Sequence, residues 1–267
     1  MVRTKKKLLI CSICMIGVGL ILAVIGFSMG GKFGIIRDKS GYKILDKEDG
    51  IVKIEASSDF KSIEINSTVD KIDIIKSYKY GIEIEYNSNE NDVNYSIKDG
   101  KLVIQGNKSQ DTFNNISFGI GNTHIPSYIK VYVPDAADLD TINVKSSNTK
   151  ITMDSIKANE ISINCSYGEI KSNNLIANGL KIASNNSDID LDGEFKGVTS
   201  ISSHYGDINL RTNISKELYN YSISCDYGDI NIDGDKFTNK VEKNGNNNAQ
   251  HSIDITSNNG DINVNFK

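Results

Sequence analysis

The chain is 267 residues long, with 30 lysines and arginines against 34 aspartates and glutamates and a net charge of −4. Four of the basic residues lie within the first seven positions, so the remainder carries 26 basic and 34 acidic residues, a net charge of −8. This mildly acidic body lacks the basic footprint that binding to nucleic acid or to anionic lipid requires, which excludes both as main partners.

The first element along the chain is an uncharged apolar segment from Leu8 to Met29. Its 22 residues are long enough to cross a ~30 Å hydrocarbon core as a helix. By the positive-inside rule, the four basic residues before it predict a cytoplasmic tail over residues 1–7 and an extracytoplasmic remainder. A cleaved signal peptide is the alternative, but residues 25–30 contain no convincing small-x-small cleavage site, and the apolar segment is longer than the apolar region of a usual signal peptide. We therefore predict a single-pass membrane anchor over residues 8–29.

Residues 30–42 are predicted to form a linker, and residues 43–267 an extracytoplasmic domain. The first part of this domain, residues 43–127, is expected to be an irregular start or cap, and residues 128–267 to be regular repeats. Stretches such as Ile63-Glu-Ile65 indicate strands before residue 105. The Gly-, Asn- and Ser-rich residues 106–127 predict a long surface loop.

The strongest feature is an internal repeat, in which an aliphatic residue is followed seven positions later by an isoleucine. The seven copies are Ile65 to Ile72, Val144 to Ile151, Ile163 to Ile170, Ile182 to Ile189, Ile201 to Ile208, Ile223 to Ile230 and Ile255 to Ile262. The closing isoleucines of the last six copies are 19, 19, 19, 22 and 32 residues apart. Such a step indicates units that stack on their neighbours. The longest step predicts a loop over the Asn-rich residues 240–248.

Apolar residues alternate with polar ones within each copy, as in Tyr221, Ile223 and Cys225, which is typical of a strand with one buried face. A 19-residue unit would extend ~63 Å as a single strand, so it must fold into two or three sides. We predict an all-β fold, a β-solenoid resembling a parallel β-helix. A β-sandwich or a propeller built of hairpins is the alternative.

A small residue stands two positions after the opening aliphatic residue of every copy. These residues are Ser67, Ser146, Cys165, Ser184, Ser203, Cys225 and Ser257. We predict that they form an inward-facing column at a bend. Cys165 and Cys225 would lie three rungs apart, ~14 Å at ~4.8 Å per rung, whereas a disulfide needs Cα atoms within about 7 Å. Both are therefore predicted to be unpaired.

The segment from Tyr128 to Val144, followed by repeats of the form Ser-x-x-Gly-Asp-Ile-x-Ile, resembles a bacterial family of candidate adhesins. Members of this family are domains of unknown function built of β-strand repeats. The resemblance covers residues 128–267 well and residues 43–127 loosely. It implies an extracytoplasmic, often membrane-tethered repeat domain that acts in adhesion or in the cell-envelope stress response. The family has no assigned catalytic residues, so the resemblance assigns none to this chain. The chain departs from the pattern at Asn148 and Asn186, where the turn glycine is missing, so these turns are expected to be less regular.

Two further columns are predicted at the turns, and they are the candidate surface sites. One holds carboxylates and the other holds tyrosines. The carboxylates are Glu169, Asp188, Asp207, Asp229 and Asp261, and the tyrosines are Tyr167, Tyr205 and Tyr227. The carboxylates would either form a ladder that binds calcium ions or each tighten its own turn. We favour the second role and predict no cofactor or metal. The tyrosines would stack against sugars or a partner protein, or cover their own glycine turns.

We find no motif for catalysis, such as His-Glu-x-x-His or Gly-x-Ser-x-Gly. The three histidines, His124, His204 and His251, lie in separate loop-like contexts. We predict a non-catalytic, adhesin-like binding module on the outer face of the cell membrane, with a cell-wall, glycan or membrane-protein partner. A sensor or scaffold in the envelope stress response is the first alternative. A carbohydrate-active enzyme on a β-helix is the second, by fold analogy alone.

Overall fold

The structure is a computed structural model that describes residues 2–28, 34–38, 41–44, 51–87, 91–108, 117–119, 126–243 and 249–267. The chain divides into two compact units. Unit 1 comprises residues 1–49 and 111–124. It contains helix α1 (Val2–Ser28) and the strands β1 (Gly34–Asp38), β2 (Gly41–Ile44) and β9 (Ser117–Gly119). The strands form a small antiparallel sheet in the order β2-β1-β9. Strand β1 therefore lies within the segment predicted to be a linker, and β9 within residues 106–127, predicted to be a loop.

Within the described residues, no helix combines the length and the apolar character needed to span a bilayer. The anchor over residues 8–29 stays a prediction from the sequence.

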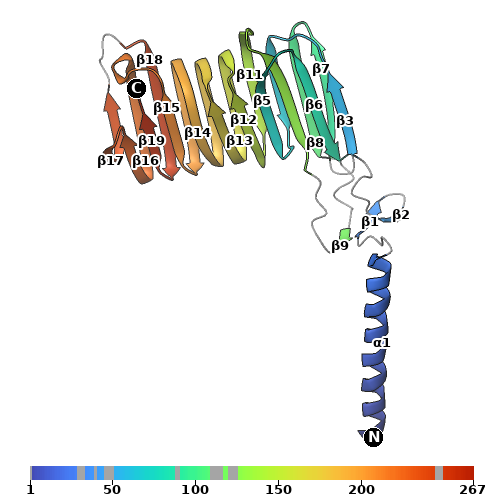
Figure 1. Cartoon of the computed structure of the whole chain (residues 1–267). Helices are drawn as coiled ribbons and strands as arrows, with labels where there is room; N and C mark the ends of the chain where they lie inside the picture. The colour runs from blue at the N-terminus through green and yellow to red at the C-terminus, as the bar shows by residue number, and fades with distance from the viewer. Residues whose placement is uncertain are drawn as a thin grey trace. The chain divides into compact units, whose positions relative to one another are not determined.

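Unit 2 comprises residues 50–110 and 125–267 and is built almost entirely of strands that stand side by side (Figure 1). Its strands are β3 (Ile51–Ala56), β4 (Ser62–Ser67), β5 (Lys71–Ser77), β6 (Gly81–Asn87), β7 (Asn91–Lys98), β8 (Lys101–Lys108), β10 (Tyr128–Pro134), β11 (Leu139–Ser146), β12 (Thr149–Asp154), β13 (Lys157–Asn173), β14 (Leu175–Tyr205), β15 (Ile208–Thr212), β16 (Tyr219–Ile232), β17 (Asp235–Lys243), β18 (His251–Asn259) and β19 (Ile262–Asn265). A 3-10 turn, η2 (Lys216–Leu218), precedes β16.

Each sequence repeat forms one rung with two sides, which we call the opening side and the closing side. The opening aliphatic residues of successive rungs pair in parallel, as Val144 with Ile163 and Ile163 with Ile182. The closing isoleucines pair in the same way, as Ile151 with Ile170 and Ile170 with Ile189. Parallel pairing in a constant register confirms the β-solenoid. The hairpin alternatives are wrong because hairpins pair their own two strands antiparallel.

The rungs do not stack in chain order at the C-terminal end. Strand β15, which closes the fifth repeat, pairs with β19 and not with β16. Strand β18 lies between β14 and β16, with Ile255 opposite both Ile201 and Ile223. The last rung of the chain is therefore inserted between the two rungs that precede it in sequence.

The N-terminal end shows the same arrangement. The rung of β4 and β5 lies between the later rung of β8 and β10 and the rung of β11 and β12. The predicted irregular start thus contains one complete rung, β4 and β5, and one strand of a second, β8, and these strands are in register with the regular repeats.

The core lies between the two sides and consists of stacked aliphatic residues. The opening and closing residues of all seven copies are at most 1% exposed. Full burial of an isoleucine stabilises the fold by about 1.5–3 kcal/mol relative to an exposed position. Each rung that joins the stack adds this contribution twice, once from its opening residue and once from its closing residue. The column of small residues is buried as predicted, from Cys165 at 0% to Ser184 at 8% exposure. Asn186 and Ser187 pair in register with Tyr167 and Gly168, so the turn without glycine at Asn186 is as regular as its neighbour.

Antiparallel strands cover both ends of the stack. Strand β17 pairs with both halves of β16 at one end. At the other end β7 pairs with β8, β6 with β10, and β3 with β6. Residues 240–243, predicted to belong to a loop, are part of β17; residues 244–248 lie outside the described part of the chain. Such caps stop further parallel addition at an open sheet edge.

Candidate functional site

The turns between the opening and closing sides line one long edge of the solenoid, which we call the turn edge. Three columns run along it. The glycine column holds Gly168, Gly206, Gly260 and Gly228 among its members, and the carboxylate column follows it by one residue. The tyrosine column precedes the glycine column by one residue. The strand register places equivalent turn residues of successive rungs directly opposite one another.

The glycine column lets successive turns approach closely. Gly206 has φ +107°, and a Cβ built on it would lie 2.4 Å from the carbonyl oxygen of Ser187 in the neighbouring rung. A side chain is therefore excluded both by the backbone conformation and by the space. The same approach allows Gly206 N–H to donate to the carbonyl oxygen of Asn259 at 3.2 Å.

The carboxylates form a hydrogen-bonded ladder between rungs. Asp188 Oδ1 accepts the backbone N–H of Asp207 at 3.2 Å. Asp207 Oδ1 accepts that of Asp261 at 2.9 Å, and Asp261 Oδ1 accepts that of Asp229 at 2.9 Å. The prediction that each carboxylate tightens its own turn is therefore wrong in its geometry, because each one holds the turn of the next rung. The order of the ladder also follows the inserted last rung.

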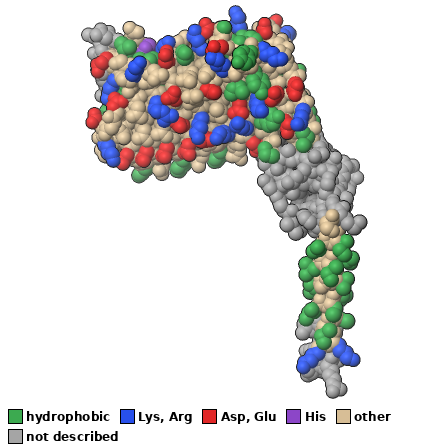
Figure 2. All heavy atoms as spheres, in the orientation of Figure 1, with side chains coloured by type: hydrophobic (Ala, Val, Ile, Leu, Met, Phe, Trp, Pro, Cys, Tyr) green, Lys and Arg blue, Asp and Glu red, His purple; other side chains and the backbone are tan. Residues whose placement is uncertain are grey.

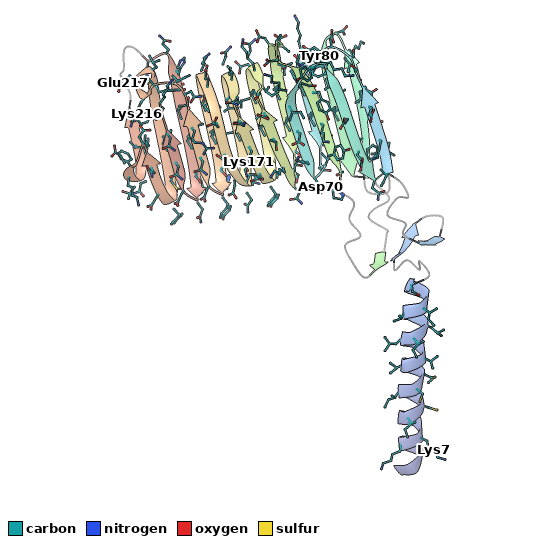
Figure 3. The ribbon with its side chains drawn as sticks, in the orientation of Figure 1. Lys7, Asp70, Tyr80, Lys171, Lys216 and Glu217 are labelled. Atoms are coloured by element: carbon teal, nitrogen blue, oxygen red, sulfur yellow. The ribbon has the colours of Figure 1, made fainter. Side chains whose placement is uncertain are left out.

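Glu169 continues this column but is bound differently. Lys150 Nζ lies 2.6 Å from Glu169 Oε2, and Lys171 contacts the same carboxylate. These two ammonium groups, Lys150 first, lower the pKa of Glu169 below its ordinary value. Figure 3 shows Lys171 on the closing side. Within the described residues, no three or more His, Cys, Asp or Glu side chains are grouped as a metal ion would require.

The tyrosines protrude from the same edge. Tyr167, Tyr205 and Tyr227 are 49%, 54% and 75% exposed, so their rings are available to solvent and are not used to cover the turns. Apolar and acidic side chains alternate along this lower edge of the solenoid in Figure 2.

Asparagines separate the tyrosines in space. Tyr167 pairs with Asn186, and both Tyr205 and Tyr227 pair with Asn259. Asn148 precedes Thr149, which pairs with Gly168, so it occupies the rung before Tyr167. The asparagines are exposed. The column therefore reads Asn148, Tyr167, Asn186, Tyr205, Asn259, Tyr227. The sequence predicted the tyrosines but not this alternation.

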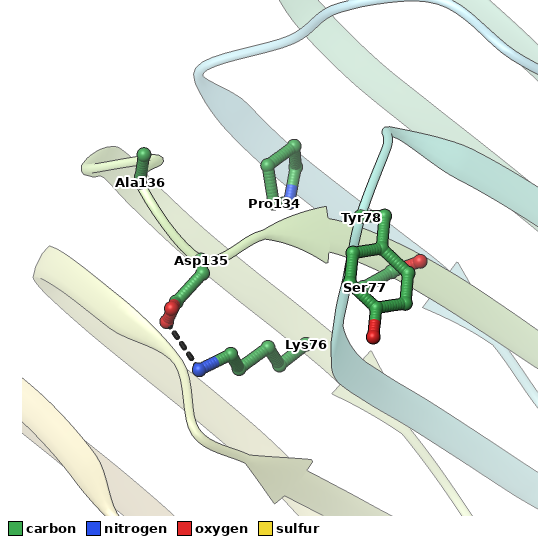
Figure 4. A pocket seen from close by; sticks show the side chains of 6 residues that line it. All are labelled: Lys76, Ser77, Tyr78, Pro134, Asp135 and Ala136. Carbon is green, nitrogen blue, oxygen red and sulfur yellow. Dashed lines mark ion pairs between the residues drawn. The ribbon is translucent and has the colours of Figure 1, made fainter.

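Among the shallow pockets formed by residues away from the turn edge are two at the ends of strands β5, β6 and β10, which the sequence did not suggest. One, of about 590 Å³, is lined by Lys76, Ser77, Tyr78, Pro134, Asp135 and Ala136 (Figure 4). Its two charged groups pair with each other, Lys76 Nζ to Asp135 Oδ1 at 2.5 Å. The other, of about 300 Å³, lies near Tyr80 and Tyr132 at the capped end.

A polar network borders the second pocket. Glu85 accepts from Lys53 at 3.0 Å and from the Tyr128 hydroxyl at 3.1 Å. Burial, and then a hydrogen bond to Glu83, raise the pKa of Tyr132 to about 12. The alternation of Glu83 with Glu85 is the signal that could have located this outward-facing group.

The two histidines in the described part of the chain lie in different surroundings. His204 is exposed one residue before Tyr205. His251 accepts the Gly197 N–H through Nδ1 at 3.1 Å, and burial lowers its pKa below its ordinary value. His124 lies outside the described residues. These positions offer no arrangement of a base beside a nucleophile.

Solved structures with a similar chain include a candidate cell adhesion protein from Clostridium sporogenes, 15% identical, with a TM-score of 0.45, covering 81% of this chain and 100% of that one. A candidate adhesin from Bacteroides fragilis is 14% identical, with a TM-score of 0.40, covering 81% and 97%. No curated protein matches the sequence. The Toastrack DUF4097 family profile matches residues 60–217 and 194–265. The profile match confirms the predicted membership of a family of domains of unknown function. The second of the two profile matches includes the inserted last rung. Together the two matches cover most of the chain. The chain therefore belongs to the Toastrack DUF4097 family.

Proposed function

We propose that the chain is a non-catalytic, adhesin-like binding protein that is held on the outer face of a membrane by its N-terminal helix, and that the turn edge is its binding surface. The observation that carries the proposal is the exposed tyrosine column, since aromatic rings with about half or more of their surface in solvent are available to a ligand. The carboxylate ladder holds neighbouring turns in register, which gives these rings a fixed spacing.

The two pockets described above, away from the turn edge, agree with a binding role and not with a catalytic one. The larger pocket is shallow and its charges neutralise each other. In the second pocket, the Glu83 carboxylate accepts a hydrogen bond from Lys130 on the neighbouring strand β10. This contact joins two strands, and neither pocket is lined by a histidine or a cysteine that would serve as a catalytic base or nucleophile.

The test is binding of the purified chain to cell-wall, matrix and membrane preparations. The triple variant Tyr167→Ala, Tyr205→Ala, Tyr227→Ala is expected to lose binding. Tyr78→Ala, which removes a fully exposed tyrosine outside the turn edge, is expected to keep it. Equal binding by all three proteins would overturn the assignment of the surface.

Two other outcomes identify the alternatives. A sensor or scaffold in envelope stress would co-purify with membrane proteins and would ignore the wall preparation. Release of soluble sugar from the preparation would indicate a carbohydrate-active enzyme, and the binding proposal would then be wrong.

A further inference from the structure

The even spacing of the tyrosine column results from the inserted last rung. In chain order, the repeat copies that contain a turn tyrosine are the third, fifth and sixth. Tyr205 and Tyr227 therefore belong to consecutive repeats of the sequence. The insertion of β18 places Asn259 between them. Each tyrosine is consequently two rungs from the next.

This arrangement defines a period along the edge. Neighbouring strands are ~4.8 Å apart, so the period is ~9.6 Å and the three rings span ~19 Å. Within each period, a ring supplies an apolar face and an asparagine supplies both a donor and an acceptor. A linear polymer whose repeating unit is about as long as two rungs can meet every ring in the same way.

The shape of the edge favours a ligand with flat apolar faces. The rings protrude, and neither pocket described above contains a residue of the tyrosine column. Proline-rich peptides, by contrast, dock in aromatic-lined grooves. In an extended β-1,4-linked glycan, successive sugars are turned over, so the same sugar face recurs once per disaccharide. The disaccharide length is close to two rungs, and sugar faces carry the C–H groups that stack on aromatic rings.

The charge beside the column restricts the ligand further. Asp188, Asp207, Asp261 and Asp229 are all exposed along the same edge. A row of carboxylates repels an anionic polymer and attracts amines, which an exposed tyrosine ring also binds through cation–π contact. The asparagine amides suit hydroxyl and acetamide groups.

Building on the proposed function, we propose that the column Asn148, Tyr167, Asn186, Tyr205, Asn259, Tyr227 binds an extended β-1,4-linked glycan of neutral or amine-bearing sugars, with one disaccharide per Asn–Tyr pair. The rings stack on alternate sugars and the asparagines hydrogen-bond to the sugars between them.

The test uses the full chain and five probes: chitohexaose, a partly deacetylated chitosan oligomer, hyaluronan as an anionic glycan, a polyproline peptide, and chitobiose as a short glycan. Titration calorimetry is expected to show binding of the first two, and weaker binding of chitobiose than of chitohexaose because it contacts fewer rings. Tyr205→Ala is expected to weaken chitohexaose binding by about tenfold, and Tyr78→Ala to leave it unchanged.

A composition-preserving variant tests the spacing itself. The double substitution Tyr227→Asn, Asn259→Tyr keeps three exposed tyrosines but moves the last ring one rung closer to Tyr205. It is expected to bind as weakly as Tyr227→Ala. Wild-type affinity in this variant would overturn the match of periods.

The remaining outcomes separate the two proposals. Binding of hyaluronan or of the polyproline peptide in place of the chitin-type probes would overturn the glycan assignment. If the wall preparation binds through Tyr205 while neither chitin-type probe binds, the glycan inference is wrong and the binding surface stands. If neither the wall nor the probes depend on Tyr205, both are wrong.

Discussion

At the scale of single residues, the turn edge depends on positions where only a glycine or a hydrogen-bond acceptor fits. Gly206 and Gly234 both have positive φ, +107° and +91°. They differ in their surroundings, since nothing lies within 4 Å of a Cβ at Gly234. Alanine substitutions at these two glycines therefore distinguish the cost of backbone strain from the cost of close packing.

We expect Gly234→Ala to lower the free energy of unfolding by about 1–3 kcal/mol, the cost of a strained backbone. Gly206→Ala is expected to cost more, because its Cβ would also press on Ser187 and Asp188. Urea unfolding of both variants measures the difference. Equal losses would mean that the turns have room to separate.

The ladder makes a related prediction about Asp207, which accepts the Asp261 N–H and donates its own N–H to Asp188. Asp207→Ala removes the acceptor and is expected to cost about 1 kcal/mol, the net value of one exposed hydrogen bond. Asp207→Asn keeps a carbonyl acceptor and should cost less. The same unfolding measurement checks both, and a larger loss in the Asn variant would point to a role for the charge itself.

The buried thiols provide a pH-dependent prediction. Burial raises the pKa of both Cys165 and Cys225 above the ordinary value of 9.0. The fold thus favours the protonated thiols. Their stabilising contribution is complete below pH 9 and is lost as the pH rises through the raised folded-state pKa.

In a Cys11→Ser, Cys14→Ser variant, a thiol reagent at pH 8 should therefore label neither remaining cysteine until urea is added. Unfolding should become easier at alkaline pH above 9, and less so in Cys165→Ser. Fast labelling of the folded protein would show that the column of small residues is open to solvent.

At the scale of elements, the inserted last rung connects the two outermost rungs at the C-terminal end of the stack. It pairs in parallel on both sides of the stack, with β14 and β15 on one flank and β16 on the other. Phe266, just after β19, packs against Tyr219 and Tyr221 with ring centroids 5.3 and 5.9 Å apart. Phe266 therefore ties the residues after β19 to strand β16.

Deletion of residues 251–267 is expected to detach the hairpin of β16 and β17, because β16 would lose its parallel partner. Hydrogen exchange should become fast in residues 219–232 and stay slow in β4, β11 and β12, since a solenoid loses stability locally through its nearest-neighbour interfaces. Deletion of Lys267 alone, an exposed residue, is the control. Unchanged hydrogen-exchange protection of β16 would contradict the role of the last rung in holding β16 in the stack.

The elements themselves were largely predictable. Alternation with period two and the polar turn identify each opening and closing strand from the sequence alone, as in Tyr221 to Ile232. The cap strands β3, β6 and β7 lie within residues 43–127, where a cap was predicted, but the C-terminal cap β17 was not predicted. Lys240 to Lys243 read as a polar loop because a strand paired on a solvated edge needs no apolar pattern.

At the scale of the whole molecule, the anchor and the orientation stay predictions. The uncharged segment over residues 8–29 and the four basic residues before it predict that deletion of residues 1–29 releases the protein from the membrane fraction. An epitope added after Lys267 should be accessible to antibody on intact cells, whereas one added before Met1 should be accessible only after permeabilisation. The reverse pattern would contradict the positive-inside assignment.

The amino-acid sequence by itself determined the all-β repeat, the inward columns of isoleucine, serine and cysteine, the unpaired thiols and the turn-edge tyrosines. All of these follow from local periodicity and turn chemistry, which a linear pattern contains. Only the tertiary structure decided which rung lies beside which. Every rung offers its neighbours the same isoleucine columns, so the local pattern is equally satisfied by several stacking orders. The folded chain adopts one of these stacking orders. That choice puts four steps, not the predicted three, between Cys165 and Cys225, joins the carboxylates into a ladder across rungs, and makes asparagine and tyrosine alternate along the turn edge.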